Sequence, residues 1–521
     1  MKKVALLQKL ICLLLVFAFL FSVCVGCKRP DDLDPNKVYE DDLTQPYTIK
    51  YYMPNVGGTG VNLIPDLPKV VVELNKILKE KINAEIQIVS YGYNDYSTKM
   101  QGIIGAGVEF DICYTAPTLN HYFLNIQRQA FLPLDTLLPT YAPTAYAMFE
   151  EDIWNQTKVD GHIYGVINRQ IMARGPGMQI HNKALFEEFL AEEYPDYTFD
   201  TFYQAEGHPL AKIEKYLDWC AENGKGNGGK MFNSNAIYLF QTLYGLDDLT
   251  SNIMTPGVVR ISDDASDGMT VINQFDCEEM EEFLSYIYRF IDKGYIPKKG
   301  TYPGAWEGYE CMPDSTYKPG QLVQYMSSGE LLTRETVRLG EMNYYTSYIL
   351  STMNAISSTS KNPARAMRFI ELLFTDKEIH NLLQYGIEGE HYTKDPENPE
   401  RINFVENTRY DNRKFGWGLG DEFMSYLQPG QVDNQWELYK EINDTAGVPE
   451  VIGFNFDMEP VKQKIADCQA LFTQYMDNIF LGAYPDPQSA LEEFRSELVA
   501  AGSNEVIAEK QRQLDAWLAQ K

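Results

Sequence analysis

Between residues 47 and 115 the sequence alternates strand-like and helix-like segments. Residues 47–54 (YTIKYYMP), 85–92 (EIQIVSYG) and 110–115 (FDICYT) are rich in β-branched and aromatic side chains, which is typical of strands. The segments between them, residues 66–81 and 96–104, place apolar side chains at helical spacing. This βαβαβ order predicts a parallel sheet covered by helices. Ligands of such sheets bind at the carboxyl ends of the strands, here residues 53–60, 91–96 and 114–118.

The first 27 residues have the pattern of an export signal. Lysines at positions 2, 3 and 9 precede an apolar run over residues 10–25, which ends in Val-Cys-Val-Gly-Cys at Cys27. We expect a signal peptide over 1–26 and lipidation of Cys27, including palmitate. Two alternatives stay open. The run is short for a membrane-spanning helix, which needs about 20 apolar residues. A signal peptide cleaved without lipidation fits Cys24, which stands where lipidation motifs usually carry Leu.

Residues 28–46 (KRPDDLDPNKVYEDDLTQP) are charged and contain three prolines. Because they offer little apolar surface to bury, we expect a disordered linker over 27–46, able to span at most about 60 Å. The formal net charge of the 521 residues is −28, which argues against nucleic acid and anionic headgroups as partners. The protein is therefore predicted to sit at the extracellular face of a cell membrane and to be held there by the lipid alone.

Capping signals mark several later helices. Asn362 followed by Pro363 predicts a helix start, and Thr375 with Glu378 forms a capping box for a helix that should end at Gly386. The last 65 residues predict three helices, with breaks at 482–487 and 502–503.

The motifs that would indicate catalysis or a cofactor are missing or incomplete. Gly224, Gly226 and Gly229 fit a dinucleotide-binding pattern, but a helix precedes them instead of a strand, so we predict a helix C-cap and a loop. The acidic run Ser262–Gly268 lacks the terminal Glu of a Ca²⁺ loop, and a hairpin turn is the better interpretation. The six histidines form no H-E-x-x-H pair and G-x-S-x-G is absent. The five cysteines after Cys27 are scattered and predict buried thiols. We therefore expect no metal, no cofactor and no catalytic residue.

Four stretches of the chain resemble a known family. They are GVEFDICYTAPTLNHYFLNIQRQAFLPLDTLLPTYAP, KVDGHIYGVINRQ, MNAISSTSKNPARAMRFIELLFTDKEIHNLLQYGIEGEHY, and GFNFDMEPVKQKI with IAEKQRQLDAWLAQ. In this order they resemble the extracellular solute-binding lipoproteins of bacterial ABC importers, in the large, mostly Gram-positive branch related to sugar and oligosaccharide binders. The last pair resembles the C-terminal domain of that branch.

The resemblance implies an α/β fold with two lobes, hinge crossovers and a helical C-terminal extension. The first lobe would comprise residues 47–165 and 319–381, and the second 166–318 and 386–450. Residues 451–521 would form a C-terminal helical domain packed on the second lobe. A ligand would bind between the lobes, which would close over it and dock on the permease subunits as a monomer.

Saccharides present hydroxyl edges and apolar C–H faces, so their sites combine aromatic rings with polar side chains. Positional analogy with the family favours residues at the strand ends, in the crossover and in the YGIEGEHY loop. The candidates are Asn55, Asp95, Tyr114, Thr115, Asn168, Gln170, Tyr385, Glu388 and Tyr392, together with Trp306 and Trp417, which lie in Gly-rich loops. Each of the polar residues has a competing interpretation as a turn cap or a hinge hydrogen bond.

The predicted function is capture of a saccharide, most simply an oligosaccharide, and its delivery to an importer. Three alternatives stay open: a lipid-anchored glycosidase, which needs only two carboxylates across a cleft, an adhesion or signalling lipoprotein with the same fold, and a receptor for a peptide or another polar solute.

Overall fold

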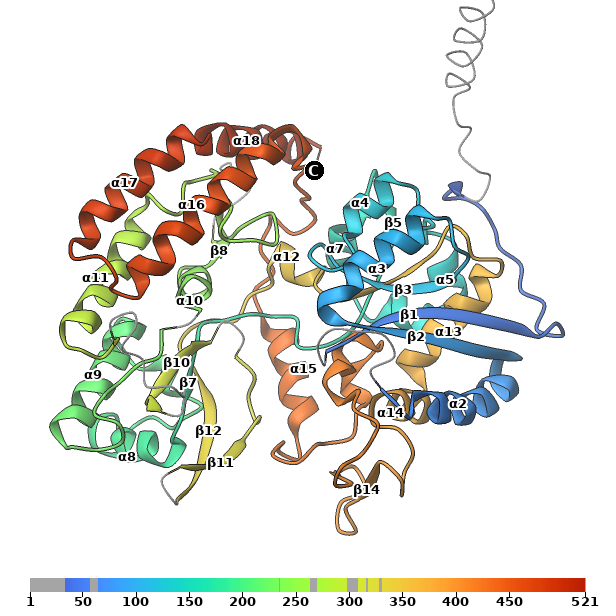
Figure 1. Cartoon of the computed structure of the whole chain (residues 1–521), viewed down its shortest axis with the longest axis horizontal. Helices are drawn as coiled ribbons and strands as arrows, with labels where there is room; N and C mark the ends of the chain where they lie inside the picture. The colour runs from blue at the N-terminus through green and yellow to red at the C-terminus, as the bar shows by residue number, and fades with distance from the viewer. Residues whose placement is uncertain are drawn as a thin grey trace, which may run out of the picture.

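The computed structural model describes residues 33–56, 64–233, 235–262, 269–297, 308–314, 317–327 and 330–520, without the side chains of 324–331. The predicted signal peptide, Cys27, Trp306 and most of the acidic run 262–268 lie outside these residues. None of the helices in the described part of the chain has the length and apolar character needed to span a bilayer. The chain forms two lobes with a helical C-terminal domain above one of them (Figure 1).

The first lobe is built on a five-stranded sheet. Its strand order is β2 (Ala84–Gly92), β1 (Tyr47–Asn55), β3 (Ile112–Thr115), β13 (Met353–Ile356) and β6 (Val166–Ile167). β1 pairs in parallel with β2 and β3, with Tyr47 opposite Ala84 and Tyr51 opposite Ile112. The predicted parallel βαβαβ unit is thus confirmed. β13, which arrives from far along the chain, pairs antiparallel with both β3 and β6.

Helices cover the first-lobe sheet on both faces (Figure 1). The helices of this lobe are α2 (Leu67–Ile82), α3 (Tyr93–Gly105), α4 (Tyr122–Gln127), α5 (Leu137–Tyr141), α6 (Pro143–Ala147), α7 (Glu151–Gln156), α13 (Pro363–Thr375) and α14 (Lys377–Tyr385), and α12 (Thr346–Ile349) lies at the crossing between the lobes. Asn362 caps α13, because its carboxamide oxygen accepts the Arg365 N–H at 2.9 Å. The cap of α14 is Asp376 instead of the predicted Thr375, and α14 ends at Gly386 as predicted. Two hairpins, β4–β5 (Lys158–Val159, His162–Ile163) and β14–β15 (Tyr392–Lys394, Ile402–Phe404), complete this lobe.

The second lobe has a smaller antiparallel sheet, in the order β10 (Cys311–Asp314), β7 (Gly177–Ile180), β12 (Glu330–Arg338) and β11 (Val323–Ser327). Around it lie α8 (Lys183–Glu193), α9 (Pro209–Glu222), α10 (Ala236–Leu243), α11 (Glu278–Asp292) and the short pair β8–β9 (Leu246–Asp247, Val259–Arg260). The Gly-rich segment after α9 has left-handed glycines at 224, 226, 228 and 229, in keeping with the predicted C-cap and loop.

Three segments cross between the lobes, at residues 168–174, 342–346 and 443–447. The N–H groups of Arg174 and Asn343 each donate to the other's carbonyl at 2.8 Å, and Tyr344 N–H donates to Gly447 O at 2.8 Å. A Cβ at position 447 would meet the far end of the Asn343 side chain, which would have to move. Helix α15 (Gln435–Thr445) lies between the lobes (Figure 1) and leads into the third crossing segment.

The three predicted C-terminal helices are present as α16 (Lys462–Phe480), α17 (Pro487–Ala500) and α18 (Ser503–Leu518). Phe472 and Phe494 have ring centroids 5.7 and 5.4 Å from that of Phe275, and Phe480 lies 6.0 Å from Phe283 in α11. These helices therefore share the core of the second lobe. The segment that leads to them, residues 450–461, starts against the first lobe, because Ile452 is buried in that lobe's core.

The lobe boundaries differ from the sequence-based ones. β12, within the segment 319–381 that we assigned to the first lobe, pairs with β7 in the second-lobe sheet. Tyr410, Phe415 and Leu419, within the segment 386–450 that we assigned to the second lobe, are buried in the core of the first lobe. Both placements depend on contacts between distant parts of the chain, and local sequence patterns do not indicate such contacts.

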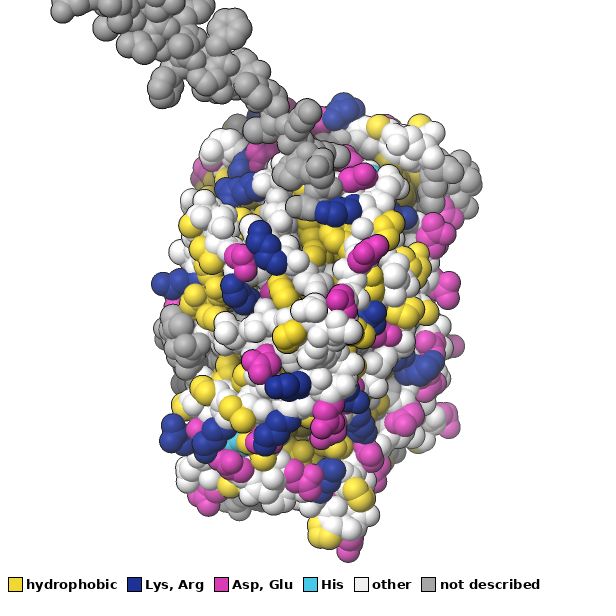
Figure 2. All heavy atoms as spheres, turned by 90° about the vertical axis from the view of Figure 1, so that its right-hand side faces the viewer, with side chains coloured by type: hydrophobic (Ala, Val, Ile, Leu, Met, Phe, Trp, Pro, Cys, Tyr) yellow, Lys and Arg dark blue, Asp and Glu magenta, His cyan; other side chains and the backbone are white. Residues whose placement is uncertain are grey.

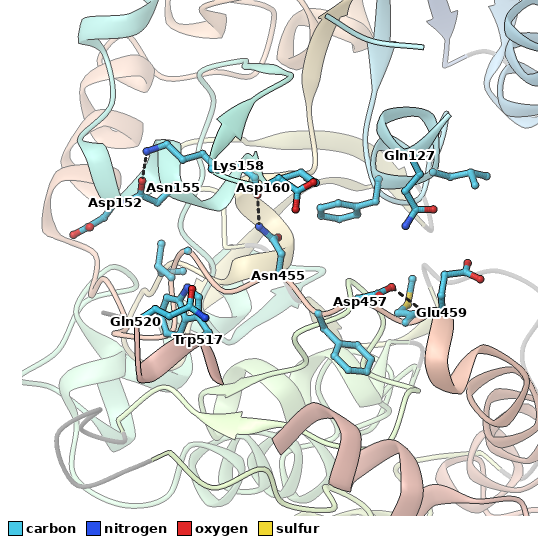
Figure 3. A pocket seen from close by; sticks show the side chains of 18 residues that line it. Gln127, Asp152, Asn155, Lys158, Asp160, Asn455, Asp457, Glu459, Trp517 and Gln520 are labelled. Atoms are coloured by element: carbon cyan, nitrogen blue, oxygen red, sulfur yellow. Dashed lines mark hydrogen bonds between the residues drawn. The ribbon is translucent and has the colours of Figure 1, made fainter. Parts of the chain in front are cut away.

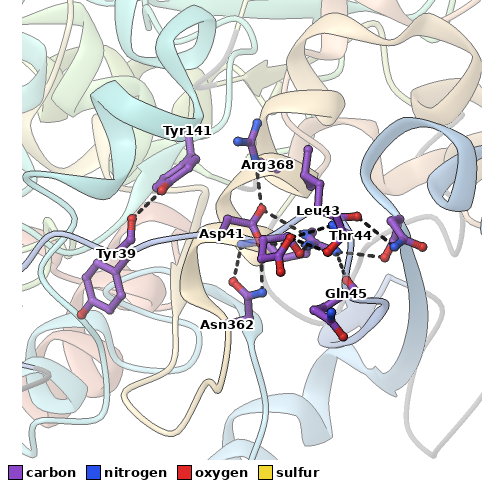
Figure 4. Close-up of polar contacts among 11 residues, drawn as sticks. Tyr39, Asp41, Leu43, Thr44, Gln45, Tyr141, Asn362 and Arg368 are labelled. Atoms are coloured by element: carbon purple, nitrogen blue, oxygen red, sulfur yellow. Dashed lines mark hydrogen bonds and ion pairs between the residues drawn. The ribbon is translucent and has the colours of Figure 1, made fainter.

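The described part of the predicted linker is folded against the first lobe, contrary to the expectation of disorder (Figure 4). Leu33 is buried, the Thr136 hydroxyl donates to Lys37 O at 2.5 Å, and the Tyr141 hydroxyl donates to Tyr39 O. The Asp41 carboxylate is fully buried against Arg365. Residues 33–46 have few apolar side chains, so their order comes from buried polar contacts that composition does not reveal. We call residues 33–46 the N-terminal strap.

Charge on the outer face of the first lobe is mixed. Lysine and arginine side chains intermingle there with aspartate and glutamate, and neither sign gathers into one patch on this face (Figure 2). The strong negative charge of the chain therefore does not create a single-signed surface on this side of the molecule.

Candidate ligand-binding site

A hollow of ≈ 410 Å³ lies where the two lobes, a crossing segment and the C-terminal domain meet. We call it the interlobe hollow. Its first-lobe wall is formed by Pro117, Thr118, His121, Phe123, Leu124 and Gln156, and its second-lobe wall by Leu249, Thr250, Ser251, Asn252 and Thr255. Thr346, Ser347 and Leu350 close it on the crossing side, and Asn455, Phe456, Met458, Glu459, Lys462 and Gln469 come from the C-terminal domain.

The first-lobe wall follows directly from the carboxyl end of β3. The chain leaves β3 in a tight turn in which Ala116 N–H donates to Leu119 O at 2.7 Å. The buried Asn120 holds this turn, because its amide donates to Tyr114 O at 2.9 Å and its side-chain oxygen accepts from Asn125 at 3.0 Å. Pro117 and Thr118 are thereby presented to the hollow by a fixed backbone, at the strand end where the parallel sheet predicts a ligand.

The second-lobe wall is a loop held by two buried carboxylates. Asp247 accepts hydrogen bonds from Leu249 N–H at 2.9 Å and from the Thr346 N–H and hydroxyl at 2.7 and 2.6 Å. Asp248 accepts from Thr250 N–H at 2.8 Å and Asn252 N–H at 3.2 Å. Because Thr346 belongs to the crossing segment, Asp247 ties this wall to the connection between the lobes.

A buried lysine of α18, in the C-terminal domain, supports the same loop. The Lys510 ammonium donates to Asp248 O at 2.9 Å and to Gly257 O at 2.6 Å. Burial lowers the pKa of Lys510 to about 7, against the opposing effect of the neighbouring carboxylates. Burial, together with the charge of Asp248, raises the pKa of Asp247 to about 6. The C-terminal domain is thus connected through polar contacts to the wall of the hollow and, through Asp247, to the crossing segment.

A second, larger hollow of ≈ 690 Å³ adjoins the first, and we call it the outer groove (Figure 3). It runs between the first lobe and the C-terminal domain. The two hollows share six lining residues, Phe123, Leu124, Asn455, Phe456, Met458 and Glu459. They are therefore neighbouring hollows at the meeting of the lobes.

Four of the sequence-predicted residues lie together beside the interlobe hollow without lining it. The Tyr114 hydroxyl donates to Ser351 O at 2.7 Å, and the Gln170 amide donates to Ser351 Oγ at 3.4 Å. The Trp417 ring, which is partly exposed, meets Tyr114 edge-on at 5.7 Å. Thr115 precedes Ala116 and is buried. This cluster adjoins α12, which contributes Thr346 and Ser347 to the hollow.

The other predicted residues are placed elsewhere. Asn168 is buried in the crossing, where its side-chain oxygen accepts from Asn354 at 2.9 Å and from Gly420 N–H at 3.0 Å. Asn55 is buried at the end of β1, and Asp95 is half-buried in α3. Tyr385 and Tyr392 pack in a separate cluster with Tyr426, and Glu388 is exposed and pairs with Lys394 at 3.4 Å. Ligand contact by these residues stays a prediction.

The lining residues that sequence reasoning missed come from turns and from the C-terminal domain. Phe123 and Phe456 are single aromatics in segments without a distinctive motif, and Asn252 lies in an irregular loop. The predicted strand-end segment 114–118 does contain two of the lining residues, Pro117 and Thr118. The remaining positions meet only through tertiary packing.

One group of side chains in the described residues has the spacing of a metal site, and its chemistry does not fit one. Asp66, Glu390 and His391 bring their ligand atoms within 4.8 Å of one another. However, His391 Nδ1 accepts the Ile387 N–H at 2.8 Å, so the neutral ring carries its proton on the Nε2 that faces Asp66 at 3.5 Å. Lys69 already pairs with Glu390. The cluster is an ion-pair network.

Comparison with known proteins gives consistent relatives. A family model described as a domain of unknown function, DUF3502, matches residues 450–519. The chain is 25% identical over 466 residues, covering 88% of this chain and 89% of the relative, to a carbohydrate ABC transporter substrate-binding protein of Streptococcus pneumoniae serotype 4 (strain ATCC BAA-334 / TIGR4).

Among solved structures, the N-glycan transport solute-binding protein NgtS of Streptococcus pneumoniae is 21% identical with a TM-score of 0.71, over 91% of this chain and 99% of that one. The same protein in complex with Man1GlcNAc gives 22% identity and a TM-score of 0.64, over 91% and 100%. The chain thus has the predicted two-lobed fold of solute-binding proteins, and its C-terminal domain is the predicted extension.

Proposed function

We propose that this protein is the extracellular solute-binding component of an ABC importer and that it captures a saccharide in the interlobe hollow. The observation that carries the proposal is the composition of the hollow, whose walls come from both lobes and from a crossing segment. A ligand that contacts both walls stabilises one relative position of the lobes, which is how binding can drive a hinge closure. The names of the similar proteins, a carbohydrate substrate-binding protein and NgtS, support this function.

The chemistry of the walls suits a sugar. Thr118, Ser347 and Asn252 offer hydroxyl and amide groups for the edges of a sugar ring, and Phe123 and Phe456 offer apolar faces for its C–H groups. Sites for small ligands combine such apolar walls with a few polar groups that fix orientation. A peptide would use the same kinds of group, so a direct binding comparison decides between the two solutes.

The hollow favours binding over hydrolysis. A glycosidase of the usual kind needs two carboxyl groups on either side of the scissile bond. Among the described residues that line the interlobe hollow, Glu459 is the sole carboxylate. We therefore propose that the ligand is released unchanged to the permease, and that no residue here has a catalytic role.

We further propose that the protein is tethered by a lipid on Cys27. The export pattern of residues 1–27 supports this, and the strap then sets the geometry of attachment. Leu33, the first described residue, is buried on the first lobe, and it lies six positions after Cys27. Such a tether would hold the first lobe within about 20 Å of the lipid, from the reach of six extended residues.

A blocking substitution tests the site. Ser347→Trp fills the interlobe hollow from a partly exposed position on α12, and we expect it to abolish the thermal shift produced by a saccharide panel. Ser285→Trp, at an exposed serine of α11, is the matched control and should bind normally. Saccharide binding that survives Ser347→Trp would place the site elsewhere, and a shift with peptides alone would refute the saccharide assignment.

A further inference from the structure

We propose that the outer groove is a second saccharide subsite, built jointly by the first lobe and the C-terminal domain, for the extension of a neutral oligosaccharide whose other end occupies the interlobe hollow. This inference rests on the proposed function and adds a role for a domain whose family carries no assigned one.

The groove has one wall from each part of the molecule (Figure 3). The first-lobe wall is formed by α4, α7 and the β4–β5 hairpin, which contribute Gln127, Asp152, Asn155, Lys158 and Asp160. The opposite wall is formed by residues 452–459 and the end of α18, which contribute Asp457, Trp517 and Gln520. In the close-up these labelled side chains lie along both sides of one open channel.

The combined size of the two hollows indicates a ligand longer than one or two sugar rings. The interlobe hollow alone, at ≈ 410 Å³, already lies within the range of about 300–1,000 Å³ that small-molecule sites occupy. The outer groove adds a larger space beside it, and Phe123 and Met458 line both hollows. In the proposed complex, a chain that fills the first hollow continues past these shared residues into the second.

The two walls of the groove are fixed relative to each other by a pair of carboxamides. The Gln156 amide donates to Phe454 O and to Asn455 Oδ1, both at 2.9 Å, and its oxygen accepts Gly453 N–H at 2.7 Å. The Asn455 amide donates to Gln156 O at 3.0 Å and to Lys158 O at 3.1 Å. The groove is thus formed before a ligand arrives, which lowers the ordering cost of binding.

An aromatic platform lies in the groove. The Trp517 indole packs edge-on against Phe454 at 5.8 Å and rests beside the backbone of Gly453, where a Cβ would lie 3.4 Å from the ring. Gly453 has a left-handed φ of +101°, a conformation that glycine adopts freely. With its orientation set this way, the indole can offer its apolar surface to the C–H groups of a sugar.

The charges around the groove select against acidic sugars. Asp152, Asp160, Asp457 and Glu459 line it, and Lys158, which donates to Asn155 at 2.6 Å, is its one described cation. Among the described residues, the one cluster with the spacing of metal ligands is the cluster at Asp66. The acidic side chains of the groove therefore do not converge as a cation site. Carboxylates and amides at a neutral sugar accept and donate hydrogen bonds, whereas a uronate or sialylated chain would be repelled.

The test compares a short and a long neutral glycan by calorimetry: Man1GlcNAc, and a longer mannose oligosaccharide with the same reducing-end GlcNAc. Trp517→Ala should weaken binding of the long glycan by about tenfold, because it removes one aromatic contact and the surface that this contact buries. The affinity for the short glycan should stay within about twofold, because this glycan does not contact Trp517.

A second pair of variants guards against misfolding of Trp517→Ala. Gln127→Ala combined with Asp152→Ala removes two exposed groove residues and should weaken the long glycan selectively, whereas Glu151→Ala, the exposed neighbour that does not line the groove, should change neither glycan. Equal losses for both glycans, or no loss for either, would overturn the subsite and leave the proposed function intact. If the unaltered protein binds neither glycan, the subsite for neutral glycans falls, and the saccharide panel then decides the proposed function separately.

Discussion

The Asp41 carboxylate lies 2.8 Å from the Arg365 guanidinium, and both side chains are fully buried. These residues are 324 positions apart in the sequence. Arg365 also donates to Asn83 O and to Asp42 O, both at 2.9 Å, and so joins the strap to the start of α13 and to the loop before β2. Because the strap is held this firmly, it does not act as a flexible linker. It fixes the N-terminal end of the described chain to the first lobe.

We expect Asp41→Asn to destabilise the protein by about 3–5 kcal/mol, because it leaves the Arg365 charge buried without its partner. Urea unfolding measures the change. The control Asp42→Asn alters an exposed carboxylate and should shift the free energy of unfolding by no more than about 0.5–1 kcal/mol. A comparably small effect of Asp41→Asn would mean that the strap does not depend on this pair.

The same pair predicts a dependence on acid. Burial alone would raise the pKa of Asp41, but hydrogen bonds from Arg365, Asn362 and Arg368 outweigh it and hold the pKa below its ordinary value. Stability from this lowered pKa is therefore complete above the unfolded-state pKa and is lost as the pH falls through the folded one. The difference in unfolding free energy between the unaltered protein and Asp41→Asn should be constant from pH 7 to 5 and shrink in stronger acid.

Lys510 predicts a further rise of stability with pH, in a higher pH range. Because burial lowers its folded-state pKa to about 7, the unfolded chain binds more protons than the folded one between that pH and the ordinary lysine value. Stability should rise with pH over this range by at most about 1.4 kcal/mol per pH unit. Lys510→Met should remove this rise and cost about 1–3 kcal/mol through its unpaired carbonyls.

Thermal unfolding from pH 7 to 10 measures the Lys510 effect. Lys464→Met, at an exposed lysine of α16 that pairs with Glu505, is the matched control and should retain the rise. A Lys510→Met variant whose stability climbs with pH as steeply as that of the unaltered protein would show that another group titrates.

The carboxamides of Gln156 and Asn455 should act as a unit, because each bonds the backbone of the other's segment as well as the partner side chain. We expect Gln156→Ala and Asn455→Ala to be non-additive in a double-mutant cycle, with a coupling energy of about 1–2 kcal/mol. Strictly additive losses would show that the first lobe and the C-terminal domain are held together by other contacts.

Cys27→Ala tests the tether. If lipid on Cys27 is the attachment, the variant should appear in the soluble fraction while its affinity for ligand, measured on purified protein, is unchanged. Continued membrane association would favour one of the alternatives, above all a retained apolar segment. A loss of affinity would mean that the N-terminal end contributes to the binding site.

Local patterns in the sequence predicted local structure well. The alternation over residues 47–115 predicted the parallel unit, Gly386 predicted the end of α14, and the breaks near 482–487 and 502 predicted three C-terminal helices. Each of these features depends on side chains a few positions apart, so a single sequence carries the information.

Features that depend on distant partners were not predictable in the same way. The strap looks disordered by composition, and its order comes from Arg365, whose position in space the sequence does not state. β12 joins the second-lobe sheet through pairing with β7. The interlobe hollow draws Thr118, Asn252 and Phe456 from three separate segments, so only its strand-end side could be predicted.

Calorimetric titration of the purified protein with neutral oligosaccharides, followed by recovery of the ligand, distinguishes capture of a saccharide from hydrolysis and from peptide binding. We expect one-to-one binding that Ser347→Trp abolishes, with the oligosaccharide recovered at its original length. Cleaved products, or binding confined to peptides, would contradict it.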